Sequence, residues 1–353
     1  MVLGVLVRDG IALCPRSTRL ADALLGGADL LRGRRCSPTR LSSFAGLIQW
    51  INLLNRPLYS CLNATFAFAR LSDEQTVCDL WPSVVGELAL NLALFPLWVV
   101  DLRSEWLDVV PVTDASPAFG YGMCMADAPP WLVRAGAAEA HGDHHFVLGD
   151  LDDRRQAAAR SGRRVDFPLP TSAFRRIFSV RAKKAKHSGE LEAEAAVLGL
   201  RRLARTKSNL GRRGLFLLDA RAVECALRKG RSSAPTLRRI VMTAAAVQLA
   251  AGLRLRFGYV PSELNPADAP SRGVRPCRRR GRPVGAGRRL RAGLSRETRN
   301  GLRLKKALFA SGLCSRSSSS GCATRRSSAG DCADAGQPTF DLAAFGVGAA
   351  EEC

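Results

Sequence analysis

The stretch VVPVTDAS, residues 109–116, is an apolar, β-branched run that closes on one carboxylate, Asp114. The turn FGYG follows at residues 119–122, and a second short apolar segment occupies 123–126. Two apolar runs on either side of glycine-bearing turn residues predict a β-hairpin. We therefore expect a strand that carries Asp114 and pairs, through this turn, with residues 121–126.

Three more acids stand at comparable junctions along the chain. Glu192 lies inside a helical pattern, Asp219 ends the apolar run LFLLD at 215–219, and Asp268 begins a predicted helix. Four carboxylates from separate elements would offer hard oxygen ligands, which suit Mg²⁺ or Mn²⁺. The sequence thus predicts a metal site of Asp114, Glu192, Asp219 and Asp268, with Glu194 as the alternative to Glu192.

The elements around these acids alternate between helix and strand. A helix is expected at 191–203, a buried strand at 215–219, a helix ending at Gly230, and another from Pro235 to Gly252. Residues 253–259 alternate as a half-exposed strand, which presents Arg254 and Arg256 to solvent or to a ligand. This order predicts an α/β fold, with a mixed sheet in which the Asp114 strand is central and parallel to the 215–219 strand.

The remaining segments are predicted more coarsely. Residues 1–40 show no sustained period and receive no assignment, whereas 41–106 are predicted to form a helical lead-in. Residues 127–187 are interpreted as an insertion with one embedded strand at best. His141, His144 and His145 lie in this insertion; they could bind a metal, but a solvated loop is favoured because no further ligand has readable spacing.

The charge distribution indicates a polyanionic partner. The formal net charge is +22, and residues 274–330 hold 16 Lys and Arg against one acid, Glu297. Such an excess most often serves nucleic-acid binding. Residues 274–353 have no core-forming pattern, so we expect a disordered, basic, low-complexity tail that contacts phosphates, or else a sequence that is not a native extension.

The cysteines and the apolar runs bear on the compartment. The 11 cysteines are odd in number and include no C-x-x-C pair, which predicts reduced thiols in an intracellular protein, nuclear or cytoplasmic and not secreted. The longest apolar stretch, 88–100, is broken by Asn91 and Pro96 and is too short to cross a bilayer. No membrane partner and no small-molecule cofactor are expected.

The segment YVPSELNPADAPSR at 259–272 carries the most specific signal in the chain. Its N-x-A-D-x-x-S-R core resembles the end of the ribonuclease H domain of retrotransposon reverse transcriptases. TDAS at 113–116, the helix motif from His187 to Ala195, and Leu218-Asp219 with KGRSS at 229–233 resemble the preceding motifs in the same order. The run at 229–233 is similar to elements of the tyrosine-recombinase (DIRS-like) class, and residues 56–106 look like the segment that connects polymerase to ribonuclease H.

The resemblance implies a ribonuclease H-like domain at 107–273 that hydrolyses the RNA strand of RNA/DNA hybrids with two divalent ions about 4 Å apart. Asp114 would bridge both ions, Glu192 and Asp219 would hold one, and Asp268 the other. Arg231, Arg254 and Arg256 are candidate nucleic-acid contacts, although for the last two a solvated strand face is an equal alternative.

Two departures from the family separate the functional alternatives. No polymerase palm precedes the domain, so the sequence resembles a truncated product or remnant. The loop before Asp268 carries Glu263 and no histidine, whereas many family members use a histidine there in product release. The alternative to a nuclease is therefore a catalytically inactive remnant that binds nucleic acid.

Overall fold

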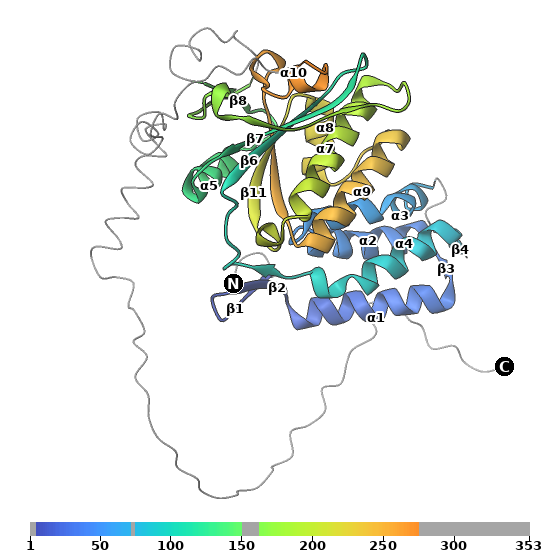
Figure 1. Ribbon diagram of the computed structural model, residues 1–353. Coiled ribbons are helices and arrows are strands. Elements are labelled where there is room, and N and C mark those ends of the chain that lie inside the picture. The colour runs from blue at the N-terminus through green and yellow to red at the C-terminus, as the bar shows by residue number, and fades with distance from the viewer. Residues whose placement is uncertain (1–4, 72–74, 150–161, 275–353) are drawn as a thin grey trace, which may run out of the picture. The chain divides into compact units, whose positions relative to one another are not determined.

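The computed structural model describes residues 5–71, 75–149 and 162–274. Its largest sheet has five strands in the order β10-β7-β6-β11-β12 (Figure 1). In chain order these strands are β6 (Val109–Ala115), β7 (Gly120–Asp127), β10 (Arg175–Arg181), β11 (Arg213–Leu218) and β12 (Arg254–Tyr259). The Asp114 strand is central, as the sequence predicts. The predicted tail lies outside the described residues, apart from Val274.

The pairing of β6 confirms both expected neighbours. β6 and β7 form an antiparallel hairpin that runs from Val109 opposite Asp127 to Ala115 opposite Tyr121. β11 lies parallel to β6 on one side and parallel to β12 on the other. β10 adds to the free edge of β7 in antiparallel orientation. The sheet is therefore mixed, with an antiparallel half and a parallel half that meet at β6.

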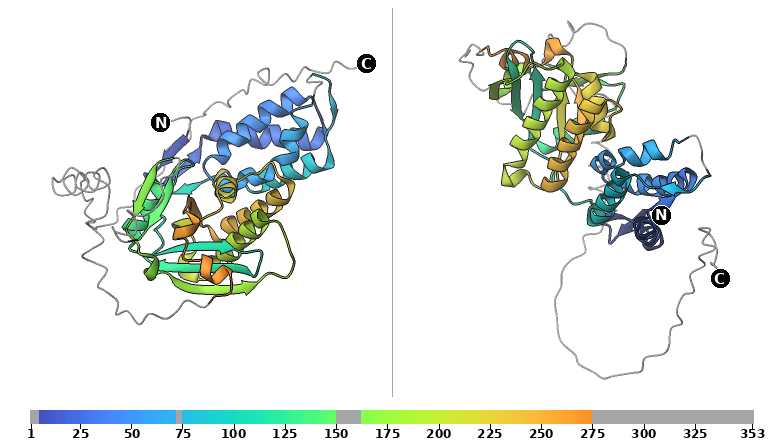
Figure 2. Two further views of the ribbon diagram at one scale, coloured as in Figure 1. Left: turned by 90° about the horizontal axis from the view of Figure 1, so that it is seen from above. Right: turned by 90° about the vertical axis from the view of Figure 1, so that its right-hand side faces the viewer.

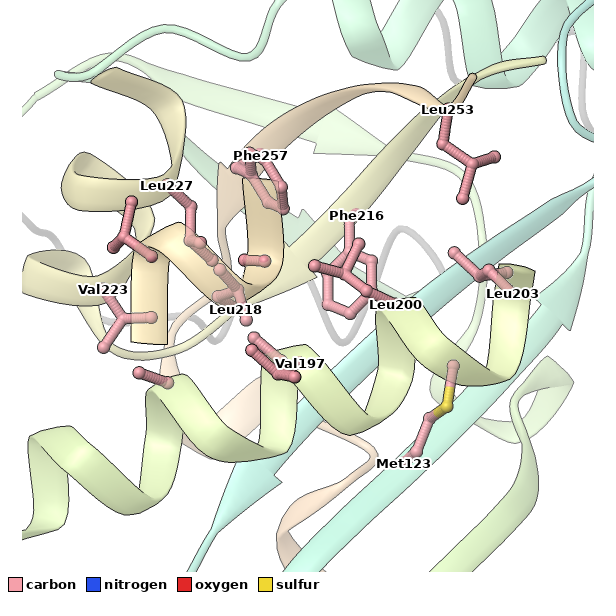
Figure 3. Close-up of a cluster of buried hydrophobic side chains, with 14 of the residues drawn as sticks. Met123, Val197, Leu200, Leu203, Phe216, Leu218, Val223, Leu227, Leu253 and Phe257 are labelled. Atoms are coloured by element: carbon pink, nitrogen blue, oxygen red, sulfur yellow. The ribbon is translucent and has the colours of Figure 1, made fainter. Parts of the chain in front are cut away.

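Alternate side chains of β11 enter two separate cores. Phe216 and Leu218 pack with helices α7 (Ser188–Ala204), α8 (Arg221–Lys229) and α9 (Pro235–Ala251), the cluster drawn in Figure 3. Leu215 and Leu217 pack on the opposite face, under α5 (Pro130–Ala138). Strand side chains alternate between the faces of a sheet, so helices on both faces require the continuous apolar run of this sequence.

The helices that cover the first face begin and end where the sequence signals them. α7 and α9 lie side by side on this face, as both views of Figure 2 show. Pro235 is the first residue of α9, and glycines in left-handed conformation end α8 and α9, with φ of +69° at Gly230 and +62° at Gly252. Glycine is favoured at this position because a β-carbon would be strained there.

The segment 127–187 is richer in structure than predicted. It contains α5 and a parallel pair, β8 (His145–Leu148) with β9 (Arg164–Phe167), then the 3-10 turn η3 (Thr171–Ala173) and β10. The expectation of one strand at best is wrong. The strands of the pair are only four residues long, and β10 mixes arginines into its apolar run, so neither shows a readable period.

Helices also dominate the chain before the large sheet, and they surround a core that includes Phe68, Leu88 and Trp98. They are α1 (Ser17–Gly33), α2 (Pro38–Asn52), α3 (Asn63–Phe68) and α4 (Pro82–Ala93), with 3-10 turns η1 (Arg56–Cys61) and η2 (Phe95–Leu97). Short strands accompany them: β1 (Val5–Arg8), β2 (Ala12–Pro15) and β5 (Val100–Asp101) in one sheet, and β3 (Arg35–Cys36) with β4 (Cys78–Asp79) in another. α2, α3 and α4 lie in stretches predicted to be helical, whereas α1 lies in the unassigned region.

This helical region contacts the elements of the large sheet directly. Arg213 at the start of β11 donates from Nη2 to the carbonyl of Asp101, 2.6 Å away. η1 packs on α9, and Gly230 lies so close to Arg56 that an added β-carbon would be 2.4 Å from its carbonyl oxygen. The side chains of η1 and α3 thereby come to lie beside the ends of α8 and α9.

Two sequence predictions concern the chain as a whole. Within the described ranges, no helix is both long enough and apolar enough to cross a membrane. The cysteines in the described part of the chain are free, as predicted: Cys14, Cys36, Cys61, Cys78, Cys124 and Cys225.

Candidate metal centre

Two of the predicted acids meet because their strands are parallel and in register. Leu218, the last residue of β11, pairs with Thr113 of β6, so Asp219 just after β11 and Asp114 on β6 lie at the same edge of the sheet. The carboxyl ends of parallel strands are the usual position of ligand sites in α/β proteins. Asp114 is buried, with 4% of its surface exposed.

Glu192 reaches the same edge from α7, which crosses β6 closely. Gly199 makes this approach possible: a β-carbon there would lie 2.8 Å from Cζ of Phe216 and 3.0 Å from Cγ2 of Thr113. The Oε1 atom of Glu192 accepts a hydrogen bond of 3.1 Å from the backbone N–H of Ala115. This bond fixes the glutamate beside the end of β6.

The three carboxylates form a compact group. Asp114, Glu192 and Asp219 each offer one oxygen, and these oxygens all lie within 4.8 Å of one another. Oε2 of Glu192 and Oδ1 of Asp219 are buried and have no hydrogen-bond partner. Buried oxygens of this kind are costly unless something compensates them, and a hard divalent cation such as Mg²⁺ or Mn²⁺ prefers such ligands. The donor set therefore fits the predicted metal.

The electrostatics of the group also favour a cation. Burial, together with the neighbouring Asp219, raises the pKa of Asp114 to about 8. Burial and the charge of the same aspartate raise the pKa of Glu192 to about 9. Like charges in a low-dielectric site disfavour ionisation, and a bound cation reverses that balance.

The C-terminal segment is anchored to the end of β6 by two polar side chains. Nδ2 of Asn265 donates to the carbonyl of Thr113 at 3.3 Å, while its Oδ1 accepts from the N–H of Ala267 at 2.9 Å. The hydroxyl of Ser271, in the short helix α10 (Asp268–Ser271), donates to Oδ2 of Asp114. Sequence reasoning gave neither residue a role, although the motif spacing N-x-x-D-x-x-S holds both.

Asp268, the fourth predicted ligand, lies beside the group and does not join it. It is outside the set of oxygens within 4.8 Å, and its Oδ1 accepts from Nε of Arg272 at 2.9 Å in an i,i+4 ion pair. Its charge nevertheless contributes to the raised pKa of Asp114 and Glu192. The structure thus brings together three of the four predicted acids and places the fourth nearby.

Glu194, the alternative to Glu192, is engaged elsewhere. Its Oε2 accepts a 2.6 Å hydrogen bond from the hydroxyl of Tyr121, and its Oε1 pairs with Lys186. Both partners lie outside the carboxylate group, so Glu192 is the glutamate of α7 in the site. Tyr121 and Lys186 were not singled out by the sequence.

The three predicted nucleic-acid contacts lie away from the carboxylates. Arg254 and Arg256 belong to the first half of β12, and Tyr259, at the opposite end of that strand, pairs with Leu218 beside Asp219. Arg254 donates to the carbonyl of Val99, and Arg256 is exposed. Arg231 follows α8 at the end distant from Asp219. Their role in binding stays a prediction.

Of the three clustered histidines in the 127–187 segment, His141 is exposed and lies outside any helix or strand, as the favoured interpretation has it, whereas the other two are buried. His144 and His145 are only 6% and 4% exposed, and Nδ1 of His144 lies 2.6 Å from the carbonyl oxygen of Glu139. For these two the favoured interpretation is wrong, because His145 is the first residue of β8, whose four residues are all buried, and His144 directly precedes it. Among the described residues, the carboxylate group is the one set of three potential ligands close enough to share an ion.

Comparison of the chain with protein-family models, and separately with curated proteins, finds no match.

Proposed function

We propose that this chain is a ribonuclease H-like nuclease that hydrolyses the RNA strand of RNA/DNA hybrids with divalent cations. The observation that carries the proposal is the convergence of Asp114, Glu192 and Asp219 at the carboxyl edge of β6 and β11. The strand order, an antiparallel hairpin continued by two parallel strands, supports the same assignment. The order of the motifs at 113–116, 187–195, 218–233 and 259–272 resembles that of the ribonuclease H family and supports the proposal.

The residues of the site would act mainly by holding oxygens in fixed positions. Ser271 orients Asp114, and the N–H of Ala115 orients Glu192. The unpartnered oxygens of Glu192 and Asp219 are then free to bind a cation. A bound divalent cation supplies an activated water and stabilises the leaving oxygen of the phosphodiester.

The experiment is cleavage of a labelled RNA/DNA hybrid in Mg²⁺ or Mn²⁺ by the full chain. Asp114→Asn should abolish cleavage while leaving hybrid affinity nearly unchanged. Asp127→Asn is the matched control, because Asp127 ends the same hairpin but is exposed and paired with Arg175. Equal cleavage by the parent and by Asp114→Asn would contradict the proposal.

A second candidate is a nucleic-acid-binding protein without catalysis. One observation favours it: the carboxylate of Asp268 is already compensated by Arg272 and stays outside the oxygen group. A site reduced to three carboxylates would hold one ion more readily than two. Hybrid binding without cleavage in either metal would decide for this candidate.

A further inference from the structure

A pocket of about 900 Å³ lies away from the carboxylates, between the N-terminal helices and the ends of α8 and α9. Tyr59 of η1 and Phe66 of α3 line one side, and Lys229 and Arg238 line the other. α8 begins two residues after Asp219 and ends at Lys229. The lining follows α8 from Ala222 to Lys229 and includes none of Asp114, Glu192 and Asp219, so the pocket is distinct from the carboxylate group.

The pocket is strongly basic. Four cationic side chains line it, namely Arg70, Lys229, Arg231 and Arg238. Within the described residues, none of these four forms a salt bridge. Unpaired cations around one concavity attract an anion by their summed potential.

The pocket lining also contains one acid, Glu87, whose charge offsets one of the four cations and whose two oxygens are both engaged. Glu87 uses Oε1 to accept from the N–H of Ala64 at 2.7 Å. Its Oε2 accepts from the N–H and the hydroxyl of Thr65, at 2.8 and 2.9 Å. These bonds hold Glu87 at the first turn of α3, and in the described part of the chain the pocket lining contains no other acid.

One nitrogen of the pocket lining lacks a partner altogether. Nε of Arg238 is buried and makes no hydrogen bond, while Nη2 of the same side chain donates to the carbonyl of Ser233 at 3.3 Å. Leaving a buried donor unpaired costs about 1–3 kcal/mol, and more for a charged group. The unpaired donor keeps the positive charge of Arg238 uncompensated on this side of the guanidinium.

The backbone adds to the attraction. Ser232 and Ser233 line the pocket just before α9, a helix of 17 residues whose N-cap, Ala234, has no side-chain hydrogen bond to offer. The first N–H groups of a helix have no partner within it and carry partial positive charge. Pro235 has no N–H, and Thr236 and Leu237 are outside the pocket lining, so the start of α9 adds its partial positive charge to the four cations without a direct contact.

Aromatic surface accompanies the basic groups. Trp81 lines the pocket, is 39% exposed, and stands edge-on to Phe68 with 5.3 Å between ring centroids. Phosphate-binding groups beside exposed aromatic faces are typical of sites for single-stranded nucleic acid, in which bases stack on the rings. Inorganic phosphate has no ring that could stack on Trp81, so the exposed indole favours a ligand that carries a base.

We propose that this pocket binds a single-stranded segment of nucleic acid, with its phosphates on Arg70, Lys229, Arg231 and Arg238 and a base against Trp81. The inference deepens the proposed function and rests on it, since it gives the nuclease a second contact with its substrate outside the carboxylate group. Arg231, which the sequence predicts to contact nucleic acid, would bind a phosphate in this pocket.

Cys225 provides a readout inside the pocket that does not depend on catalysis. Its thiol lines the pocket and is partly exposed, as is the thiol of Cys78 on β4, which lies outside the lining. In the full chain with EDTA, a saturating single-stranded oligonucleotide should slow alkylation of Cys225 at least tenfold and leave Cys78 unchanged. Inorganic phosphate or a nucleoside monophosphate at the same phosphate concentration should not protect Cys225.

Matched double variants complete the test. Arg70 and Lys229 are exposed, so R70Q/K229Q should fold, lower affinity for the oligonucleotide about tenfold, and abolish protection of Cys225. R201Q/R239Q removes two exposed cations outside the pocket lining and should change affinity less than threefold. Equal losses in both variants, or no protection of Cys225, would overturn the pocket proposal.

The pocket and the metal centre can fail separately in these tests. Asp114→Asn should keep full protection of Cys225, because EDTA removes any metal from both proteins. Protection without hybrid cleavage would retain the pocket and reject the nuclease. Cleavage of the hybrid without protection of Cys225 would retain the nuclease and reject the pocket. Protection by free phosphate at the same concentration would overturn the proposed polynucleotide ligand.

Discussion

The hydroxyl of Ser271 donates a hydrogen bond to Oδ2 of Asp114, although the two residues are 157 positions apart in the chain. Ser271 is fully buried, and its Oγ also lies 2.7 Å from the carbonyl oxygen of Asp268, so it ties α10 to the central strand. This contact fixes the orientation of the most deeply placed carboxylate of the site. It also brings Asp268 close enough for its charge to act on Asp114.

Ser271→Ala should therefore reduce hybrid cleavage about tenfold through kcat, because Asp114 loses the donor that orients it. The free energy of unfolding should fall by about 1–2 kcal/mol, the usual cost of leaving a buried polar partner unpaired. Cleavage kinetics and urea denaturation measure the two effects. Ser262→Ala, at the exposed start of η5 (Ser262–Leu264), should change neither.

Gly122→Ala tests the close contact between β7 and α10. A β-carbon at Gly122 would lie 2.5 Å from the backbone N of Ser271 and 2.6 Å from the carbonyl oxygen of Ala267. Since backbone must shift to admit it, we expect a loss of about 1–3 kcal/mol in stability and weaker cleavage. Gly86→Ala, in α4 where nothing lies within 4 Å of the new carbon, should be neutral or stabilising by up to about 1 kcal/mol. Equal effects of the two variants would contradict the packing described here.

The arrangement of elements around the site follows from patterns that the sequence carries locally. The run 215–219 is apolar at every position before Asp219 because β11 is buried on both faces. This continuous apolar run is why the strand could be predicted from the sequence. Gly230 and Gly252 mark helix ends for a similar reason, since they adopt conformations that other residues avoid.

Other features depend on tertiary contacts that no local pattern encodes. α1 was not predicted because Gly26 and Gly27 interrupt its pattern, yet a β-carbon at Gly27 would lie 2.5 Å from Cδ1 of Leu92 on α4. Gly27 therefore lies where α1 and α4 pack closely, and a larger residue would clash there. The roles of Asn265 and Ser271 likewise depend on partners about 150 residues away in sequence.

The raised pKa values of the site predict an unusual dependence of stability on pH in the absence of metal. The folded protein holds protons on Asp114 and Glu192 up to about pH 8 and 9, whereas the unfolded chain releases them near pH 4. The folded state binds more protons in this window, so stability should fall as pH rises from about 5 to 8. Thermal unfolding in EDTA measures the slope.

The Asp114→Asn variant is the control for this dependence of stability on pH. Asparagine cannot ionise, so the fall in melting temperature between pH 5 and 8 should become shallower than in the parent. Added Mg²⁺ should raise the melting temperature of the parent more at pH 8 than at pH 6, because cations bind the deprotonated carboxylates. A parent whose stability rises over this range at the same slope as Asp114→Asn would contradict the assigned shifts.

The two glutamates of α7 provide a matched pair for metal binding. Glu192→Gln should abolish both cleavage and the rise in melting temperature that Mn²⁺ produces, since Oε2 of Glu192 is one of the free oxygens of the site. Glu194→Gln should keep both, because Glu194 is occupied by Tyr121 and Lys186. Calorimetric scans with and without Mn²⁺ separate the variants. If Glu194→Gln, and not Glu192→Gln, lost the rise in melting temperature with Mn²⁺, Glu194 would be the metal ligand and Glu192 would not.

The central claim is that Asp114, Glu192 and Asp219 together hold a divalent cation. Its most direct test is a crystal of the full chain soaked in Mn²⁺, with anomalous scattering used to locate the metal. We expect a peak within about 2.0–2.3 Å of one oxygen from each of the three carboxylates, and no such peak in Asp114→Asn. A Mn²⁺ peak bound elsewhere, with these carboxylates left without metal, would contradict it.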